Sequence, residues 1–518
     1  MKRIKSTILY GLLVASSGLL VTSCADKLDL SPIDYYGSGS YWKTEAQATA
    51  YIDGIHKHLR DAAWQHTITF GELRGGRFIT GASSDGMGVS NGDIILQNFD
   101  ETHTGVSKFG DLFGRITNLN LFIARVTDAT YLSDEMKNFY LGEVYGLRAF
   151  YYFDLYRIYG GVPLRLTADV VEGVIDPNKL YMEYFGSMND FDPYKRGKKV
   201  YWSKAATECL MGEVYLWTSK VTTGDDVANP ADLTIAKTHL ESVLNNYNLK
   251  MLDNFSQVFN AKNKANDEII FAIRFLEGEA TNSNGTFTYN VGTGSTKNRY
   301  QANGEVFGDA LDIQNTGNQT YEYNKAVYQS FDDADTRKEA TFIASYNKDG
   351  KTGELSLYGT HVRKNIGYVN AQGARVYCGD YIFYRLPWVY LTLAEIANME
   401  GDNAAVAKYI NLVRKRAYGN AWDETLYAYP ETADFTTNEL AILHEKDKEF
   451  IQEGQRWWDL RRMTLTKGGT PLVFCKEGSL LGDAPILNKS TEAHKLLWPI
   501  EKTMLDKDPA LEQTPGYK

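Results

Sequence analysis

Apolar residues recur three or four positions apart through most of this chain, which is the spacing of an amphipathic helix. Stripes of this kind predict helices that open near Trp42 and extend over 111–126, 141–153 and 438–454. Over 386–417 two such stripes are separated by a short polar turn, as in a helix–turn–helix pair. The pattern therefore predicts a mainly helical protein in which neighbouring helices form pairs.

Two of the helical segments share a short motif. Leu141-Gly142-Glu143-Val144-Tyr145 and Met211-Gly212-Glu213-Val214-Tyr215 both combine an apolar residue, a glycine, two further residues and a tyrosine. This matches the first helix of a tetratricopeptide unit, where the glycine lets the partner helix approach and the tyrosine fills the groove. We therefore predict close helix contacts at Gly142 and Gly212, each followed by a packed tyrosine.

Helical spacing is lost between about 255 and 385. Within this stretch, 268–273 has the character of a short strand, and 281–303 is a loop rich in glycine, asparagine, threonine and tyrosine. The predicted fold class is mainly α: a tetratricopeptide-like scaffold of helical pairs with one large irregular, partly β insert. We expect scaffold and insert to form a single domain over 41–518.

The first two dozen residues have the pattern of a bacterial lipoprotein signal. A basic start precedes an apolar run over 8–21, which is too short to span a bilayer, and small residues then lead into Cys24. We expect removal of 1–23, acylation of Cys24 as the membrane anchor, and a polar linker over 24–40. The alternative is an ordinary secretory signal that happens to precede a cysteine.

Composition narrows the classes of partner. The chain has 55 basic and 65 acidic residues, a net charge of −10, which argues against a nucleic-acid-binding surface. With Cys24 lipidated, Cys209, Cys378 and Cys475 form an odd set that permits one disulfide at most, and whether any of them pair is left open. Tyrosine is abundant, with 35 residues, and we expect most of these to pack between helices.

No motif for catalysis, a metal or a cofactor stands out. His444-Glu445 begins like a zinc-protease helix, but Lys448 stands where a second histidine is needed. We therefore expect no catalytic residues, no metal ligands, no cofactor and no enzymatic activity. A glycosidase pair of carboxylates stays open, because such pairs cannot be recognised among 65 acidic residues.

Several motifs, in a fixed order along nearly the whole chain, carry a family resemblance. They are Leu147-Arg148-Ala149-Phe150-Tyr151-Tyr152-Phe153, Tyr159-Gly160-Gly161-Val162-Pro163-Leu164, Asp333-Ala334-Asp335-Thr336-Arg337, Tyr384-Arg385-Leu386-Pro387, Glu449-Phe450-Ile451-Gln452-Glu453-Gly454-Gln455-Arg456-Trp457-Trp458-Asp459-Leu460-Arg461-Arg462, Trp498-Pro499-Ile500 and Gln513-Thr514-Pro515-Gly516-Tyr517. With them the chain resembles the SusD/RagB family of Bacteroidetes outer-membrane lipoproteins, the substrate-binding partners of SusC-type TonB-dependent transporters.

One position departs from the family pattern. Glu445-Lys446 stands where the family usually has a Glu-Arg pair, and lysine lacks the planar fork that binds a carboxylate through two hydrogen bonds. The family's last motifs are largely scaffold. The resemblance therefore implies that Arg456 and Asp459 belong to a buried network joining the last helices and do not contact ligand.

The resemblance implies a lipid-anchored outer-membrane protein that faces the cell exterior. It would capture a glycan and deliver it to a SusC-like TonB-dependent transporter without covalent catalysis. An oligopeptide is the first alternative ligand, since some members serve oligopeptide uptake. A surface glycoside hydrolase is a second alternative, from a different class of protein.

In the family the binding face draws on the loop after the first helices and on the central insert. Here these are the glycine-rich stretch 64–100 and the tyrosine-rich stretch 281–303. The predicted ligand-binding residues are Trp64, Arg74, Arg77, Asp85, Tyr289 and Tyr300. The alternative interpretation is structural: the tryptophan anchors a helix end, the arginines form surface ion pairs and the tyrosines hold the loop in place.

Overall fold

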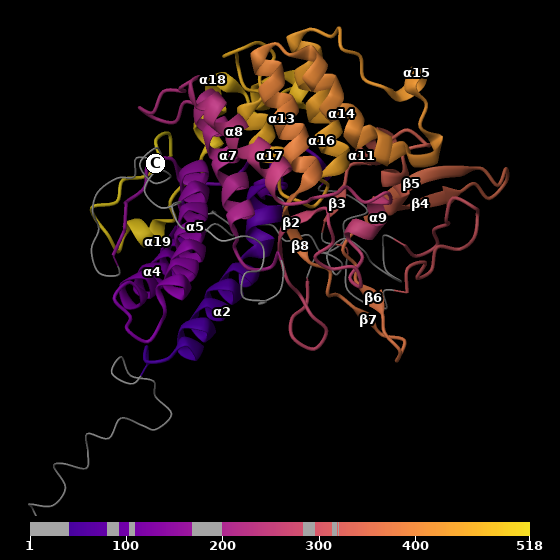
Figure 1. Ribbon diagram of the computed structural model, residues 1–518. Helices are drawn as coiled ribbons and strands as arrows, with labels where there is room; N and C mark the ends of the chain where they lie inside the picture. The colour runs from indigo at the N-terminus through magenta and orange to yellow at the C-terminus, as the bar shows by residue number, and fades with distance from the viewer. Residues whose placement is uncertain are drawn as a thin grey trace, which may run out of the picture.

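The computed structural model describes residues 41–79, 93–102, 109–167, 199–282, 296–312, 319 and 321–517. Helices dominate these residues, and the strands are few and short (Figure 1). The predicted mainly helical class is confirmed. Cys24 and the predicted signal and linker lie outside the described residues.

Long helices form the scaffold, and consecutive helices pack against each other as pairs. The long helices are α2 (Glu45–Asp61), α4 (Phe109–Val126), α5 (Asp134–Tyr159), α7 (Lys204–Lys220), α8 (Asp232–Asn246), α13 (Leu386–Glu400), α14 (Asn403–Tyr418) and α16 (Phe435–Glu449). The pairs are α4 with α5, α7 with α8, and α13 with α14, which lie side by side in Figure 1. This arrangement is compatible with the tetratricopeptide interpretation, which stays a prediction.

Local sequence explains where these helices begin and end. The side chains of Ser203, Asp402 and Asp434 each accept a hydrogen bond from a backbone N–H in the first turn of the following helix. α13 ends at Gly401, whose φ of 81° is accessible to glycine at little steric cost. Polar caps and a terminal glycine therefore determine where the helices of these pairs begin and end.

Short helical segments connect the scaffold. They are η1, a π-helix (Gln65–Phe70), α9 (Phe255–Val258), α11 (Lys325–Gln329), α12 (Thr336–Thr341), η2 (Gly419–Ala421), α15 (Glu424–Tyr427), α17 (Arg456–Arg462), η3 (Leu472–Phe474), η4 (Lys476–Gly478), α18 (Lys489–Glu492), η5 (Ala493–Leu496) and α19 (Lys502–Leu505).

The predicted insert contains short antiparallel strand pairs, which extend from the centre to the right of Figure 1. β2 (Ile269–Ile273) pairs with β8 (Tyr381–Arg385), β4 (Phe342–Lys348) with β5 (Leu355–Val362), and β6 (Tyr368–Val369) with β7 (Arg375–Val376). β3 (Glu322–Tyr323) pairs with β1 (Phe78–Ile79), which lies outside the insert. Because β2 and β8 are near the two ends of the insert, their pairing closes it at its base, directly before α13.

Two sequence-based predictions need correction. The helix predicted over 438–454 ends at Glu449, because the chain then turns and Gly454 adopts a φ of 76°. Only one strand, 268–273, was predicted in the insert, whereas seven of the described strands lie there. All seven are only two to eight residues long, so their local pattern is weak.

One large apolar core joins the scaffold helices to the insert. It extends along the chain from Ala48 to Ile500 and includes residues of both β2 and β8. Many tyrosines of α5 are buried in it, as expected for helix packing. Cys209, Cys378 and Cys475 are free thiols. In the part of the chain that is described, no helix is both long enough and apolar enough to cross a membrane.

A buried cluster of charges fastens the insert to the last helices. Glu449, at the end of α16, accepts hydrogen bonds from Arg337 (3.0 Å), Arg385 (2.5 Å) and Arg416. Burial raises the pKa of the Glu449 carboxyl, but the three guanidinium groups outweigh that effect and hold the pKa below its ordinary value of 4.5. The three arginines come from α12, β8 and α14, so this one carboxylate connects distant parts of the chain.

A second buried cluster contains the position that departs from the family pattern. The Lys446 ammonium lies 2.8 Å from Asp459, and Arg462 donates two hydrogen bonds to Glu395, at 2.9 and 2.8 Å. Arg456 is also buried and pairs with Asp447 at 2.5 Å. The predicted scaffold network is present, although Arg456 and Asp459 reach different partners.

Candidate functional site

The structure describes four of the six predicted ligand-binding residues. Asp85 and Tyr289 lie outside the described residues, as does the lipidation site Cys24. Trp64, Arg74, Arg77 and Tyr300 are described, and they do not share one environment.

Arg74 and Arg77 are in the interior, with 0% and 1% of their surface exposed, so the prediction that they contact ligand on a surface loop is wrong. The Arg77 guanidinium pairs with Glu72 at 2.7 Å and donates to the Asp447 carbonyl at 2.9 Å. Arg74 lies 4.0 Å from the ring centre of Trp457, and burial lowers its pKa to about 9. The surrounding turn folds inward because these two side chains have partners on distant segments.

Trp64 and Tyr300 are half-buried and lie in different surroundings. The Trp64 ring, between α2 and η1, packs 5.1 Å from the ring of Tyr321. Tyr300 forms backbone hydrogen bonds with Tyr346 of β4, and the Lys348 ammonium lies 5.2 Å from its ring centre. Their role in ligand binding stays a prediction.

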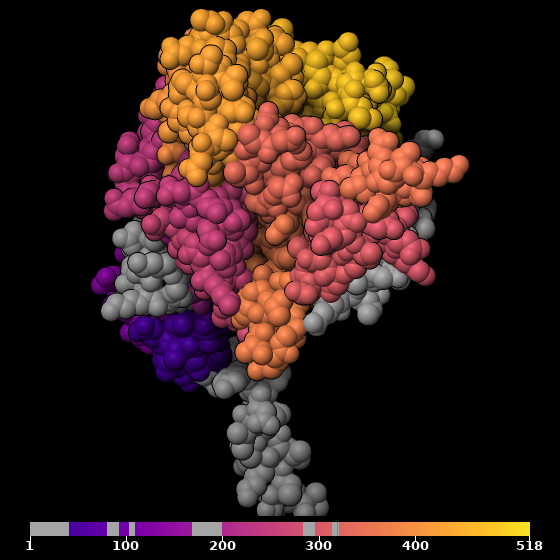
Figure 2. Space-filling model, turned by 90° about the vertical axis from the view of Figure 1, so that its right-hand side faces the viewer, coloured from indigo at the N-terminus to yellow at the C-terminus, as the bar shows by residue number. Residues whose placement is uncertain are grey.

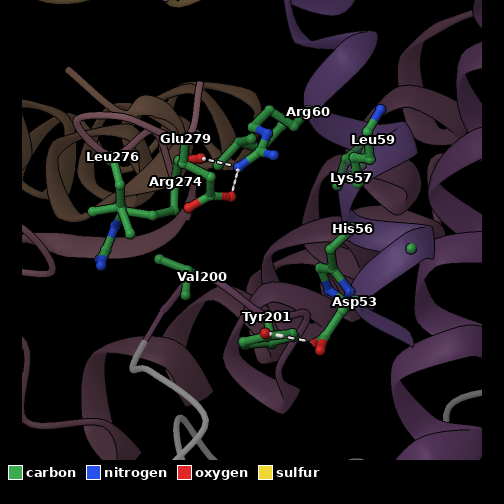
Figure 3. A pocket seen from close by; sticks show the side chains of 12 residues that line it. Asp53, His56, Lys57, Leu59, Arg60, Val200, Tyr201, Arg274, Leu276 and Glu279 are labelled. Atoms are coloured by element: carbon green, nitrogen blue, oxygen red, sulfur yellow. Dashed lines mark hydrogen bonds and ion pairs between the residues drawn. The ribbon is translucent and has the colours of Figure 1, made fainter. Parts of the chain in front are cut away.

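A cavity of about 570 Å³ opens between α2 and the segment that follows β2 (Figure 3). We call it the α2 cavity. It is lined by Asp53, Gly54, His56, Lys57, Leu59, Arg60, Val200, Tyr201, Ile273, Arg274, Leu276 and Glu279. Its volume lies within the usual range for a small-molecule or sugar site.

One wall of the α2 cavity is formed by polar side chains of α2 and the aromatic ring of Tyr201. The Tyr201 hydroxyl donates to Asp53 at 2.8 Å, and its ring meets the His56 ring edge-on at 4.7 Å. His56 Nε2 accepts from the Trp202 backbone N–H, so Nδ1 carries the proton and donates to the Ile52 carbonyl. The imidazole is therefore neutral and held in one orientation.

The opposite wall is the turn after β2. The Arg60 guanidinium reaches across to Glu279 at 2.5 Å and to the Arg274 carbonyl at 3.4 Å, as the dashed lines in Figure 3 show. Arg274 is itself held by the buried carboxylate of Asp380 at 3.0 Å. The Leu276 side chain is 42% exposed at the rim, which places an apolar surface beside these charges.

A second cavity, of about 450 Å³, adjoins the α2 cavity across the same turn, because Leu276 and Glu279 line both. Beside it, Glu277 accepts hydrogen bonds from Asn370 (3.0 Å) and Tyr368 (2.6 Å), and these bonds lower the pKa of its carboxyl. Figure 2 shows the side of the molecule that carries the insert, with indigo α2 beside it. The two cavities form one polar surface with exposed apolar and aromatic portions.

This arrangement suits noncovalent binding of a polyhydroxylated ligand. Carboxylate, guanidinium and phenol groups can exchange hydrogen bonds with hydroxyls, while Leu276 and Tyr201 offer surfaces for the C–H faces of a sugar. Within the described ranges, no group of three or more histidine, cysteine, aspartate or glutamate side chains could hold a metal ion.

Sequence reasoning missed the α2 cavity. The apolar stripe of α2 was recognised, but Asp53, His56 and Arg60 on its other side look like an ordinary solvated face. Tyr201 carried no signal of its own among 35 tyrosines. Only packing of the 200–201 and 273–279 segments beside α2 turns this face into a cavity wall.

Comparison with known proteins agrees with this architecture. A model of the SusD family matches residues 267–517. A crystal structure of a SusD superfamily protein from Bacteroides fragilis is 94% identical, covers 92% of this chain and 100% of that chain, and superposes with a TM-score of 0.88. The curated SusD-like protein P38 from Formosa agariphila is 22% identical over 100% of both chains.

Surface glycan-binding protein A from Bacteroides uniformis shares the fold, with a TM-score of 0.68, 18% identity, and coverage of 91% of this chain and 99% of that chain. The 94% identity to a SusD superfamily structure, over 92% of this chain, determines the class of protein. The chain belongs to the SusD family.

Proposed function

We propose that this protein is a surface-exposed outer-membrane lipoprotein that captures a glycan and passes it to a SusC-type TonB-dependent transporter. The α2 cavity carries the proposal, because it combines sugar-sized volume with hydrogen-bonding groups and an aromatic ring. Membership of the SusD family supports the transporter partner and the lipid anchor at Cys24. Capture and delivery need no covalent chemistry.

We further propose that Tyr201 and Arg60 belong to the glycan site, since both line the α2 cavity from different segments. Screening the purified protein on arrays of glycans and oligopeptides would identify the ligand. Glycan binding is the expected result. Binding of oligopeptides alone would favour that alternative ligand, and turnover of a glycan would favour a glycoside hydrolase.

Calorimetry with the glycan found on the array then locates the site. Tyr201→Ala should weaken binding by roughly 1–3 kcal/mol, as expected when a contact aromatic is lost. Trp64→Ala and Tyr300→Ala test the earlier sequence-based site in the same way. A loss confined to Trp64→Ala and Tyr300→Ala would place the glycan outside the α2 cavity, whereas a loss confined to Tyr201→Ala would place it inside.

A further inference from the structure

A third cavity lies at the far end of α7. The α2 cavity includes Val200 and Tyr201, just before α7, whereas this cavity of about 410 Å³ begins at Lys220, the last residue of α7. A helix of 17 residues is roughly 25 Å long, so the two cavities are separate. We call the third one the α7 cavity.

The described ionisable side chains that line the α7 cavity are all basic. Among the described residues, its lining contains Lys220, Arg461 and His494 but neither aspartate nor glutamate, although the whole chain carries a net charge of −10. Apolar and hydroxyl-bearing residues complete the wall. They include Val221, Thr222, Thr223, Phe474, Leu496 and Leu497.

Two of the three basic residues need no anionic ligand to offset a positive charge. Lys220 pairs with Glu395 at 2.7 Å and with Glu439 at 2.9 Å. Burial lowers the pKa of His494, which favours its uncharged form. Arg461 is therefore the residue whose charge needs an explanation.

Arg461 is 4% exposed and lies on α17. One of its terminal nitrogens donates to the Arg157 carbonyl at 2.5 Å, while its buried Nε has no hydrogen-bond partner in the described part of the chain. The indole rings of Trp217 and Trp458 lie 5.0 and 5.5 Å from the guanidinium carbon. These contacts hold the side chain in place without neutralising it.

Two neighbouring buried arginines differ in this respect, whereas buried Arg74 also has no carboxylate partner among the described residues but does not line the α7 cavity. Arg462 pairs with Glu395 and Asp459, and Arg157 pairs with Asp154 and Glu213. For Arg461, burial and then the positive charges of Arg74 and Arg157 lower the pKa well below its ordinary value of 12.5. A buried guanidinium without a carboxylate is unfavourable, and an anion in the adjoining cavity would offset that cost.

We propose that the α7 cavity binds the carboxylate of an acidic sugar, with Arg461 as its counter-ion. The inference deepens the proposed glycan-binding function and rests on it. The apolar wall suits the face of one sugar ring, and the cavity volume of about 410 Å³ limits the ligand to a small unit or a chain end. Arginine suits this role because its planar group can donate two parallel hydrogen bonds to a carboxylate.

Calorimetry on the purified protein, with D-glucuronate and D-glucose as matched probes, tests the proposal. Glucuronate should bind and glucose should bind at least about 10-fold more weakly, since charge-assisted hydrogen bonds discriminate by this amount or more. Arg461→Met should weaken glucuronate binding at least about 10-fold. Its melting temperature should not fall, because the substitution removes an uncompensated buried charge.

Arg125→Met provides the matched control, since it removes a guanidinium from an exposed position on α4. It should leave glucuronate binding unchanged. If Arg461→Met does not fold, Thr223→Trp is the second variant, because it fills the cavity from its wall without touching Arg461's charge, and it should also weaken glucuronate binding.

Equal glucuronate affinity in wild type and in the folded Arg461→Met or Thr223→Trp variant would overturn the proposal. So would equal binding of glucose and glucuronate, or binding of inorganic sulfate without glucuronate, which would assign the cavity to a different anion. None of these results would contradict glycan binding in the α2 cavity. Failure of the array screen and of Tyr201→Ala would instead contradict the proposed function itself.

Discussion

At the scale of single residues, this protein places many charged side chains where water is excluded. Glu449 is 0% exposed and Arg337 is 1% exposed, and each forms ion pairs with several groups of opposite charge. Such clusters are sensitive to the loss of one member, because the remaining charges then stay buried without compensation. Arg461 and Arg74 differ, because neither of these buried guanidinium groups pairs with a carboxylate of the described residues, and only Arg461 lines the α7 cavity.

Glu449→Gln should lower the free energy of unfolding by roughly 3–5 kcal/mol, because Arg337, Arg385 and Arg416 would lose their shared carboxylate. Urea titration followed by circular dichroism measures the change. The control is Glu424→Gln, which removes an exposed carboxylate 3.6 Å from Lys415 and should change stability by less than about 1 kcal/mol. Equal effects of the two substitutions would contradict the importance of the buried cluster.

Stability should also fall in acid. In the folded protein burial opposes ionisation of Glu395, Glu445 and Glu449, but neighbouring cations hold their pKa values below the ordinary 4.5. The unfolded chain therefore takes up more protons as the pH falls through about 4.5, and the stabilisation present above that pH is lost progressively below it.

Urea midpoints measured between about pH 7 and about pH 3 check this dependence. The slope of stability against pH below about 4.5 should be shallower in Glu449→Gln than in wild type, since that variant lacks one of the shifted carboxyls. A midpoint that stays constant over this range would show that these carboxyls do not stabilise the fold.

At the scale of elements, glycine determines how closely two helices approach. A Cβ placed on Gly212 of α7 would come within 2.5 Å of Leu240 on α8, so the predicted close contact at Gly212 is confirmed. Tyr215, one turn later, is buried as predicted. Gly142 is buried in α5, and its proposed role in a close contact stays a prediction.

Gly212→Leu should overpack the α7–α8 pair and lower the free energy of unfolding by roughly 1–3 kcal/mol. Gly114→Leu is the matched control, since a Cβ on Gly114 of α4 would meet no atom within 4 Å. That control should be neutral or slightly stabilising, because glycine disfavours a helix interior. Denaturant midpoints compare the two, and an unchanged midpoint for Gly212→Leu would exclude overpacking.

At the scale of the whole molecule, the insert and the scaffold share one core and enclose separate cavities at the two ends of α7. The β2–β8 pair joins the ends of the insert, and the chain passes from β8 directly into α13.

Cys24→Ala should yield a folded protein that no longer partitions with outer membranes, because the proposed anchor is the lipid on that cysteine. Fractionation of cells that lack the transporter measures this without the partner's contribution. Circular dichroism of the released protein serves as the folding control. Unchanged membrane association of the variant would contradict the lipid-anchor proposal.

The helices and the family could be predicted from sequence because both depend on local information. Residues three or four positions apart face the same side of a helix, so stripes within 111–126 and 386–417 were visible before any packing was known. Ordered motifs such as the run from Glu449 to Arg462 identified the family in the same way. Helix ends that depend on tertiary turns, such as the one after Glu449, were placed less well.

The binding surfaces depended on contacts between segments far apart in the chain. Arg77 looked like a surface residue in a glycine-rich loop, but it meets Asp447, 370 positions away. Arg60 meets Glu279, 219 positions away, and so forms part of a cavity that neither segment reveals alone. The spacing of apolar residues determined which segments are helices, whereas only the tertiary structure decided which charges are paired, buried or available to a ligand, because pairing depends on distance in space.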